Sequence, residues 1–471
     1  MGYMEEDNIP MIEPVYTTDT TKEIFFSSSE IGLLSEMVNG TTKIDKDSAI
    51  KVALKMIGYN KPMSKSGVSV TAFGTPSNRL TKYTNPIDFD TTLYVINSHN
   101  GGFAVVSADV RIPEQILAFS NTGNLLLDND NPAFTIFLNY AKDYAASCIF
   151  NTQEQQDSIE NSIYDKIGIN PNTIKSHSLS KAKRLLQKIL LTNLCNTQTT
   201  VETTAELKPL LNTNWYQTSP YNEKVGGSCP DSTKYKAGCV AVATAQLITY
   251  WRHPQMMNNI IFNWNMLNNE TKVGTYDYND QAATLIKIVG QSIKTDYGCS
   301  NSSADPCSSL HLLWYLGYKV PTVMSVYKYD DVINNLNKRW PVFMSGHRTN
   351  EGSLFFHNYK NGHQWLVDGY VNQKITARNS LTYVVVEYDD ATGQSSSHYE
   401  YANSVNITES KYIHINWGWE DTNGYFCKDV FDVNEKYILG SDGKYIRQPN
   451  NIKDRNYKFA LEYAKDLHFK N

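Results

Sequence analysis

Cys239 is the residue whose surroundings most clearly favour chemistry. It lies in the segment KAGCVAVATAQLITYWRHP (236–254), directly after Gly238. An alanine-rich run with one apolar face follows and stops at Pro254, which predicts a helix that begins at the cysteine. The positive end of a helix dipole favours a thiolate, and the thiolate is the nucleophile. Taken alone, the segment also fits a small buried core cysteine.

His363 is the first candidate for the base that a nucleophilic cysteine requires. Near neutral pH a histidine can accept the thiol proton and later donate it to a leaving amine. His363 opens the strand-like segment GHQWLVDGY, where Trp365 and Val367 lie on its side of the pleat. A polar ring among core residues is costly unless it has a partner. The alternatives are a satisfied core histidine at this position, or His414 as the base.

Asn416, Trp417 and Gln217 could complete such a site. The Asn416 amide could accept from the imidazole N–H and fix its tautomer, and Trp417 could shield that bond from water. The Gln217 amide, in NTNWYQTSPYN (212–222), could bind an oxyanion together with the backbone N–H of Cys239. In isolation each of the three fits a plainer role, as a turn asparagine, a core aromatic or a surface glutamine.

The elements that must position these groups follow from hydrophobic periodicity and turn signals. Residues 412–417 alternate, Asn423-Gly424 is typical of a tight turn, and Tyr425-Phe426 resume a strand. Upstream, the pattern predicts a small α+β domain. Its expected elements are a helix over 45–59, two strands within 92–110 around Asn100-Gly101-Gly102, a strand over 115–120, and a helix over 131–148 with Pro132 at its first position.

Polar composition predicts where these parts are separated. Residues 1–24 are aperiodic and are expected to form a mobile tail. Residues 151–205 contain a basic patch (181–191) followed by CNTQTTVETTAE, a linker by composition. We therefore place a domain boundary near residue 200.

Length and composition exclude several function classes. The chain has 471 residues, of which 41% are apolar and 19% charged, enough for about two or three globular domains. Its net charge of −5 gives no general case for nucleic acid or an anionic membrane. No apolar run reaches the roughly 18 residues of a membrane span. The patterns H-E-x-x-H, G-x-S-x-G, G-x-G-x-x-G and the P-loop are absent, which disfavours zinc peptidases, serine hydrolases and nucleotide enzymes.

The seven cysteines form no C-x-x-C pair, so a zinc ribbon or thioredoxin-type site is not expected. Only Cys299 and Cys307 are close enough in sequence to suggest a local disulfide. The opening MGYMEEDNIP lacks a basic n-region and an apolar core, so we do not expect it to be a signal peptide.

The order Gln217, Cys239, His363, Asn416 is that of papain-like cysteine peptidases, although the papain signature C-G-[SA]-C-[WY] is absent. The segments that stand here instead closely resemble the streptopain family, peptidase family C10. They are WYQTSPYN, GCVAVATAQLITYW, GHQWLVDGY and INWGWEDTNGYF, which span about 210–426. LYVINSHNGGFAVVSADVRIPEQILAFS (93–120) resembles the propeptide of the same family.

The resemblance implies an α+β, papain-like fold, with a helical part carrying the cysteine and an antiparallel sheet carrying the histidine and asparagine. It implies a mobile tail over 1–24, an inhibitory propeptide with its linker over 25–200, and a peptidase domain over 201–471. The site residues that it implies are Cys239 as nucleophile, His363 as base, Asn416 and Trp417 on the imidazole, and Gln217 in the oxyanion hole.

The same resemblance implies a secreted, cell-surface or periplasmic endopeptidase made as a zymogen, with any export signal outside this sequence. We expect cleavage within about 190–206, protein or peptide substrates, the propeptide as intramolecular inhibitor, a monomer, and no metal or organic cofactor. Residues 387–410 exceed the family pattern and are predicted to form an inserted surface hairpin or loop.

Two other functions stay open. An inactive surface-binding protein could keep this fold, although every candidate catalytic residue is present. A transglutaminase-type acyltransferase would use an acidic third residue, for which only Asp368 is near His363, on the opposite side of the strand.

Overall fold

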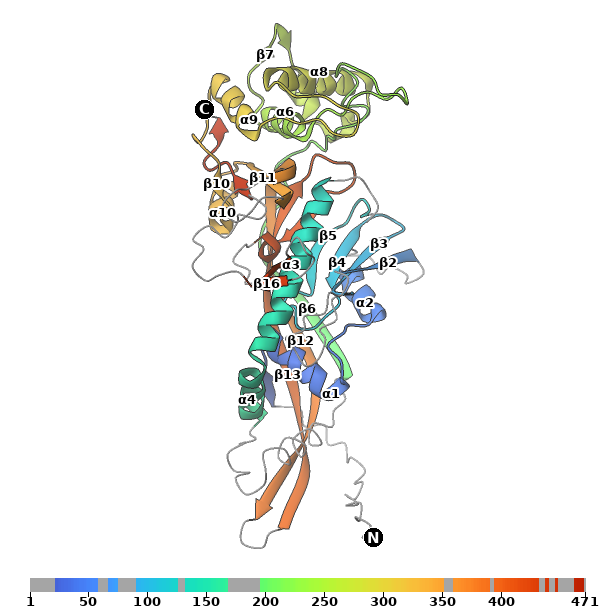
Figure 1. Ribbon diagram of the computed structural model, residues 1–471, viewed down its shortest axis with the longest axis vertical. Coiled ribbons are helices and arrows are strands. Elements are labelled where there is room, and N and C mark those ends of the chain that lie inside the picture. The colour runs from blue at the N-terminus through green and yellow to red at the C-terminus, as the bar shows by residue number, and fades with distance from the viewer. Residues whose placement is uncertain are drawn as a thin grey trace. The chain divides into compact units, whose positions relative to one another are not determined.

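The computed structural model describes residues 22–57, 67–74, 90–125, 132–167, 195–350, 359–389, 394–431, 437–439, 445–447 and 461–469 (Figure 1). The chain divides into two compact units, each built from several stretches of sequence. Within the described residues no helix is both long and apolar enough to cross a membrane.

The first unit comprises Met1–Thr42, Gln155–Val201 and Ile375–Thr408. Helix α1 (Ser28–Asn39) begins with a capping box, in which Ser27 and Glu30 bond each other's backbone N–H groups. Glu30 also forms a 2.6 Å ion pair with Lys166 at the end of α4 (Gln156–Ile167). Strand β1 (Glu23–Phe25) pairs in parallel with β13. The unit also has its own small apolar core.

The second unit comprises Lys43–Glu154, Glu202–Lys374 and Glu409–Asn471. Most of its strands belong to one sheet with the order β10-β17-β11-β12-β13-β14-β5-β4-β3-β2. Strands β12 and β13 also contribute residues to the first unit. In sheet order the bounds are Ser325–Val326, Glu462–Tyr463, Val342–Asn350, Tyr359–Asp389, Gln394–Asn416, Gly424–Cys427, Ile116–Ser120, Phe103–Ser107, Leu93–Ser98 and Val68–Phe73.

The pairing of β5 with β14 joins the N-terminal strands to the C-terminal ones in a single sheet. The two strands are antiparallel, with Phe119 opposite Tyr425 and Ala118 opposite Phe426. Helix α3 (Pro132–Glu154) packs Phe137 edge-on against Phe426. Helix α2 (Lys46–Ile57) contacts β3, β4 and β5 (Figure 1). The helices and strands predicted between residues 45 and 148 are confirmed within the described residues, and α3 extends six residues beyond Cys148.

A second apolar core surrounds helix α6 (Cys239–Trp251) in the same unit. Helices α8 (Tyr276–Ser292) and α9 (Pro306–Tyr315) lie beside it (Figure 1). Small alanine side chains let these helices approach, and every α6 residue from Cys239 to Thr249 is buried. The shorter elements are α7 (Trp264–Leu267), α10 (Tyr329–Asn337), η2 (Glu270–Lys272), η3 (Lys428–Phe431), β7 (Met256–Met257), β8 (Ile260–Ile261), β9 (Tyr318–Lys319), β15 (Tyr437–Leu439), β16 (Tyr445–Arg447) and β18 (His468–Phe469).

The segment expected to be a linker is a strand instead. Strand β6 (Cys195–Leu207) pairs with β12. Its threonines and Val201 are β-branched and favour extended backbone, an effect that outweighs the polar composition on which the linker prediction depended. Of the predicted tail, residues 1–21 lie outside the described residues, as does the basic patch at 181–191. Of the predicted insertion at 387–410, residues 387–389 end β12 and residues 394–410 begin β13, which pairs with β12, while residues 390–393 lie outside the described residues.

A buried carboxyl group connects the N-terminal and C-terminal parts of the second unit. Glu114, which is 7% exposed, accepts a hydrogen bond from the Tyr144 hydroxyl. Asp429 and Lys428 of η3 and the buried Cys427 thiol also face it. Burial above all, and then the charge of Asp429, raise the pKa of Glu114 from 4.5 to about 7.

This raised pKa predicts a pH-dependent loss of stability. The contribution of Glu114 to the free energy of unfolding is fully present below pH 4.5. It is lost progressively as the pH rises to about 7, and it does not change further above that pH. The decline amounts to roughly 1.4 kcal/mol for each unit of pKa difference. Glu114→Gln stays neutral and should flatten this part of the profile. Urea unfolding between pH 4.5 and 8 measures the difference. Parallel profiles for the two proteins would contradict the prediction.

Candidate active site

Cys239 is the first residue of α6, as its sequence context predicts. Gly238 precedes it with φ 86° and ψ 132°, a backbone conformation that favours glycine. A β-carbon there would also lie 3.3 Å from Thr295 Cγ2 and 3.4 Å from Ser302 Cβ. The thiol is therefore held at the positive end of the helix dipole, with the Cys239 side chain 8% exposed.

His363 lies on β12 opposite Gly346 of β11, and its side chain is 3% exposed. Its Nε2 is 2.7 Å from the Trp417 carbonyl oxygen. Because a carbonyl only accepts, Nε2 carries the hydrogen, which leaves Nδ1 to face the thiol. The rings of Trp365 and Trp417 flank the imidazole at centroid distances of 6.1 and 6.4 Å, so both shield it from water.

The surroundings of Cys239 favour its ionised form. Burial alone raises the pKa of the thiol, but the His363 charge and hydrogen bond act against burial. The backbone N–H groups of Gln364 and Val240 also bond the sulfur, and together these groups hold the pKa below 9. A thiolate–imidazolium pair is the arrangement that nucleophilic attack by cysteine requires.

Asn416 is buried beside this pair, but its hydrogen-bond partners differ from the predicted one. Its side chain bonds the Thr213 carbonyl, the Gln246 amide and the Gly418 N–H. The acceptor on the imidazole is instead the backbone carbonyl of the next residue, Trp417. Asn416 ends β13 and turns its side chain toward α6, so the carbonyl that follows it reaches the histidine.

Gln217 lies beside the residues that directly precede Cys239. Its backbone carbonyl accepts from Ala237 N–H at 2.9 Å, and its side chain is 3% exposed. Nearby, Trp215 is buried, and its indole N–H donates to the Tyr278 hydroxyl at 2.9 Å. The loop carrying Gln217 is thereby anchored to α8 next to the start of α6.

The competing histidine has a different partner. His414 Nδ1 lies 2.6 Å from the Asp368 carboxylate, whose other oxygen accepts from the Leu211 N–H at 3.1 Å. Asp368 thus pairs with His414, away from His363, which leaves the acyltransferase alternative without its acidic third residue on the candidate base.

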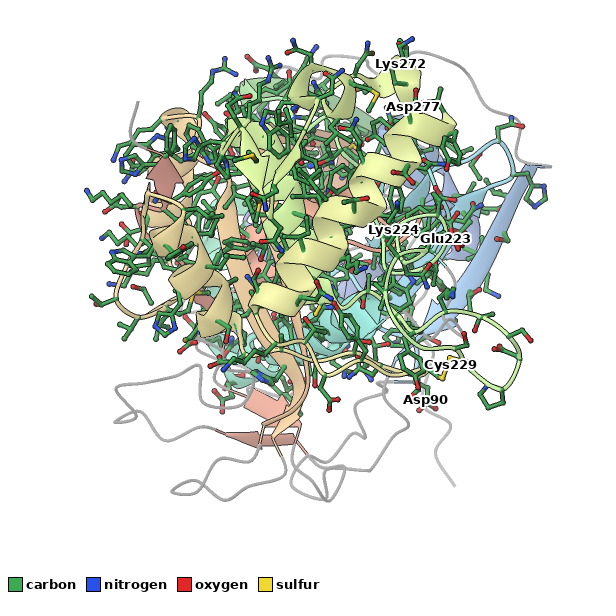
Figure 2. All side chains as sticks on the ribbon, turned by 90° about the horizontal axis from the view of Figure 1, so that it is seen from above. Asp90, Glu223, Lys224, Cys229, Lys272 and Asp277 are labelled. Atoms are coloured by element: carbon green, nitrogen blue, oxygen red, sulfur yellow. A yellow bond between two sulfur atoms is a disulfide. The ribbon has the colours of Figure 1, made fainter. Side chains whose placement is uncertain are left out.

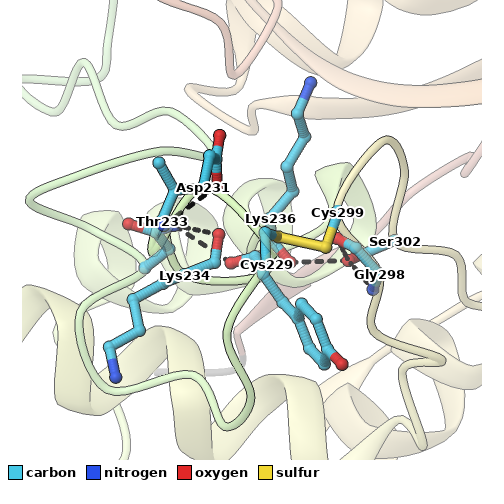
Figure 3. The surroundings of a disulfide bond; sticks show 10 residues. Cys229, Asp231, Thr233, Lys234, Lys236, Gly298, Cys299 and Ser302 are labelled. Carbon is cyan, nitrogen blue, oxygen red and sulfur yellow. Dashed lines mark hydrogen bonds between the residues drawn. A yellow bond between two sulfur atoms is a disulfide. The ribbon is translucent and has the colours of Figure 1, made fainter.

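A disulfide braces the loops around the start of α6. It links Cys229 to Cys299, 70 residues apart (Figure 3). Cys299 therefore does not pair with Cys307, the partner that sequence proximity suggested. Cys229 lies with Glu223 and Lys224 on the loop that leads to α6 (Figure 2). Sequence proximity misled because α9 carries Cys307 away as an exposed free thiol, whereas the fold brings the Cys229 loop to Cys299.

Hydrogen bonds extend this brace to the nucleophile. The Lys236 N–H donates to the Gly298 carbonyl at 3.1 Å, and the Ser302 hydroxyl donates to the Lys236 carbonyl at 2.6 Å (Figure 3). Lys236 is three residues before Cys239, so the bridged loops fix the approach to the helix.

Two family models match regions of this chain, and one of them contains the candidate site. Residues 215–426 match the family model described as the Peptidase C10 family, and residues 41–145 match that of the Spi protease inhibitor. Residues 215–426 are a Peptidase C10 region. The chain is a cysteine peptidase zymogen, in which a propeptide inhibitor region precedes the peptidase region. The resemblance drawn from the sequence segments is confirmed, and the α+β fold class with it.

Two solved structures from Prevotella intermedia are similar to this chain. A prointerpain A fragment has 18% identity and a TM-score of 0.46, covering 86% of this chain and 100% of its own. The active interpain A cysteine protease has 19% identity and a TM-score of 0.34, covering 57% of this chain and 97% of its own. The comparison with curated proteins gave no match.

Sequence reasoning missed two groups at this site, the Trp417 carbonyl and the Gln246 amide. A backbone carbonyl leaves no sequence signal. Gln246 left one, because it is an amide residue within the largely apolar CVAVATAQLITYW helix.

The thiol pKa gives a direct test of the Cys239–His363 contact. His363→Ala removes the opposing charge, so burial should then raise the Cys239 pKa above 9. The pH dependence of alkylation by iodoacetamide, read at Cys239 by peptide mass mapping, measures it. His414→Ala is the matched control and should leave the midpoint unchanged. Equal midpoints for wild type and His363→Ala would contradict the prediction.

The disulfide predicts a stability effect confined to one pair of cysteines. Replacing Cys229 and Cys299 together by serine should cost about 4 kcal/mol, since the bridge closes a 70-residue loop. Urea unfolding without reductant, in a Cys239→Ala background, measures the loss. Cys307→Ser removes an exposed thiol and should change nothing; an equal loss from that control would argue against the assigned pairing.

Proposed function

We propose that this protein is a secreted, streptopain-like endopeptidase that hydrolyses peptide bonds through a thioester on Cys239. The observation that carries the proposal is the buried pair of Cys239, at the start of α6, and His363, whose Nε2 donates to the Trp417 carbonyl at 2.7 Å. His363 also lowers the pKa of the Cys239 thiol despite burial. The match to the Peptidase C10 family supports both the chemistry and the extracellular location.

The reaction begins when the Cys239 thiolate attacks the scissile carbonyl carbon. The oxyanion is bound by the backbone N–H of Cys239 and the side-chain amide of Gln217, each worth on the order of 10²–10³ in rate by analogy. His363 Nδ1 then donates its proton to the leaving amine, and the carbon–nitrogen bond breaks to leave a thioester.

Deacylation uses the same groups in reverse. His363 Nδ1 takes a proton from water, the hydroxide attacks the thioester, and the thiolate leaves. Throughout, the Trp417 carbonyl accepts from Nε2 and restrains the orientation of the ring, while Asn416 supports the turn that carries this carbonyl. No step requires a metal or an organic cofactor.

The proposed inhibitor is the N-terminal part of the chain itself. Its strands continue the sheet of the peptidase part through β5 and β14, and α3 packs against the same sheet. Activation would cleave the chain within about 190–206, at or before the end of β6 (Cys195–Leu207). We propose that the released enzyme acts as a monomer on protein or peptide substrates.

A time course of the purified chain under reducing conditions tests the proposal. Wild type should cleave itself within 190–206 and degrade an added unfolded protein, as read by intact mass and gel. Cys239→Ala should do neither, and Cys307→Ala, which removes another free thiol, should behave as wild type. If wild type is silent, a trace of trypsin removes the propeptide. Silence after that removal would favour the inactive binding protein instead.

A further inference from the structure

Gln246 is a buried amide in the helix that carries the nucleophile. It lies seven residues after Cys239, about two turns along α6, and its side chain is 0% exposed. Its neighbours on the helix are largely apolar. A buried amide is costly unless all its polar atoms are paired, so its partners indicate what it holds in place.

Gln246 and Asn416 form a reciprocal amide pair. Gln246 Nε2 donates to Asn416 Oδ1 at 3.2 Å, and Asn416 Nδ2 donates to Gln246 Oε1 at 3.1 Å. The same Oε1 accepts from the backbone N–H of Trp215 at 3.1 Å. One side chain of α6 therefore binds both the end of β13 and the segment that leads to Gln217.

Asn416 connects Gln246 to the peptide group that bonds the His363 imidazole. Its remaining N–H donates to the Thr213 carbonyl at 2.9 Å, and its Oδ1 also accepts from the Gly418 N–H at 3.1 Å. That N–H belongs to the same planar peptide as the Trp417 carbonyl. Fixing the N–H therefore fixes the direction of the carbonyl that accepts from His363 Nε2.

We propose that Gln246 is a positioning residue for the catalytic pair. It holds Asn416, and through the Trp417–Gly418 peptide it sets the plane of His363 relative to Cys239. By binding Trp215 it also fixes the loop of Gln217 against the same helix. This inference rests on the proposed peptidase function, although Gln246 touches no reacting atom.

The chain contains a matched control on the same helix. Thr249 is also 0% exposed, and its hydroxyl bonds the Ala245 carbonyl within α6 at 2.9 Å. Thr249→Val removes a buried hydrogen bond with little change of volume and without touching the active site. It separates a general loss of stability from a loss of positioning.

The principal variant is Gln246→Met, which keeps the length of the side chain and removes the amide. After propeptide removal with trypsin, kcat on a peptide substrate should fall about 10- to 100-fold while KM stays within about twofold. The alkylation midpoint of Cys239 should rise, because a misaligned imidazole stabilises the thiolate less. Thr249→Val should change neither quantity. Wild-type kcat and midpoint in Gln246→Met would overturn the proposal.

A double-mutant cycle tests the route through Asn416. If Gln246 acts through Asn416, the double variant Gln246→Met/Asn416→Ala should lose little more kcat than the worse single variant. Gln246→Met combined with Thr249→Val should show additive effects. Additive losses in the first cycle would contradict positioning through Asn416.

Two measures keep the test decisive. If Gln246→Met fails to fold, Gln246→Glu replaces it. A protonated glutamic acid can still donate and accept a hydrogen bond, whereas an ionised one can only accept. The alkylation rate of Cys239 in this variant should therefore approach the wild-type rate at low pH and fall below it as the carboxyl group ionises. A pH dependence identical to wild type would overturn the proposal. Alkylation needs no turnover, so wild-type enzyme that cleaves no peptide would refute the proposed function while this readout still decides the role of Gln246.

Discussion

The hydrogen bond from His363 Nε2 to the Trp417 carbonyl is the constraint on which the candidate site depends. It assigns the hydrogen to Nε2 and leaves Nδ1 for Cys239, whose pKa is lowered in spite of burial. A backbone carbonyl cannot rotate away independently, as a side-chain amide can. The imidazole is therefore held by the path of the chain through Asn416 and Gly418, and the proposed role of Gln246 is to hold that path.

The sheet supplies the frame for this bond. His363 lies on β12 and Trp417 directly follows β13, which is the neighbouring strand. The nucleophile belongs to the second apolar core, around α6, whereas Trp365 and Trp417 beside His363 belong to the first core. Both cores lie in the second unit of the chain. The propeptide strands join the same sheet at β14, which begins at Gly424, seven residues after Trp417. Inhibitor and catalytic residues thus share one structural element.

Sequence reasoning predicted the local features well because local rules govern them. The helix beginning at Cys239, the shared face of His363 and Trp365, and the N-terminal elements follow from periodicity, glycine and proline signals. The misjudged features depend on partners distant in sequence. The polar stretch at 195–207 has β-branched residues that favour extended backbone, and it pairs with the distant strand β12. Cys299 bonds a cysteine 70 residues upstream. Spacing along the chain does not show which distant segments will meet.

The sequence by itself determined the family and the residue types of the site, because nucleophile, base and amides each need particular side chains in a particular order. Only the tertiary structure decided which atom bonds the imidazole. That choice depends on the direction of one peptide group, which is set by a glutamine 170 residues away from Asn416. Backbone carbonyls are identical at every residue, so only folding gives one of them a function.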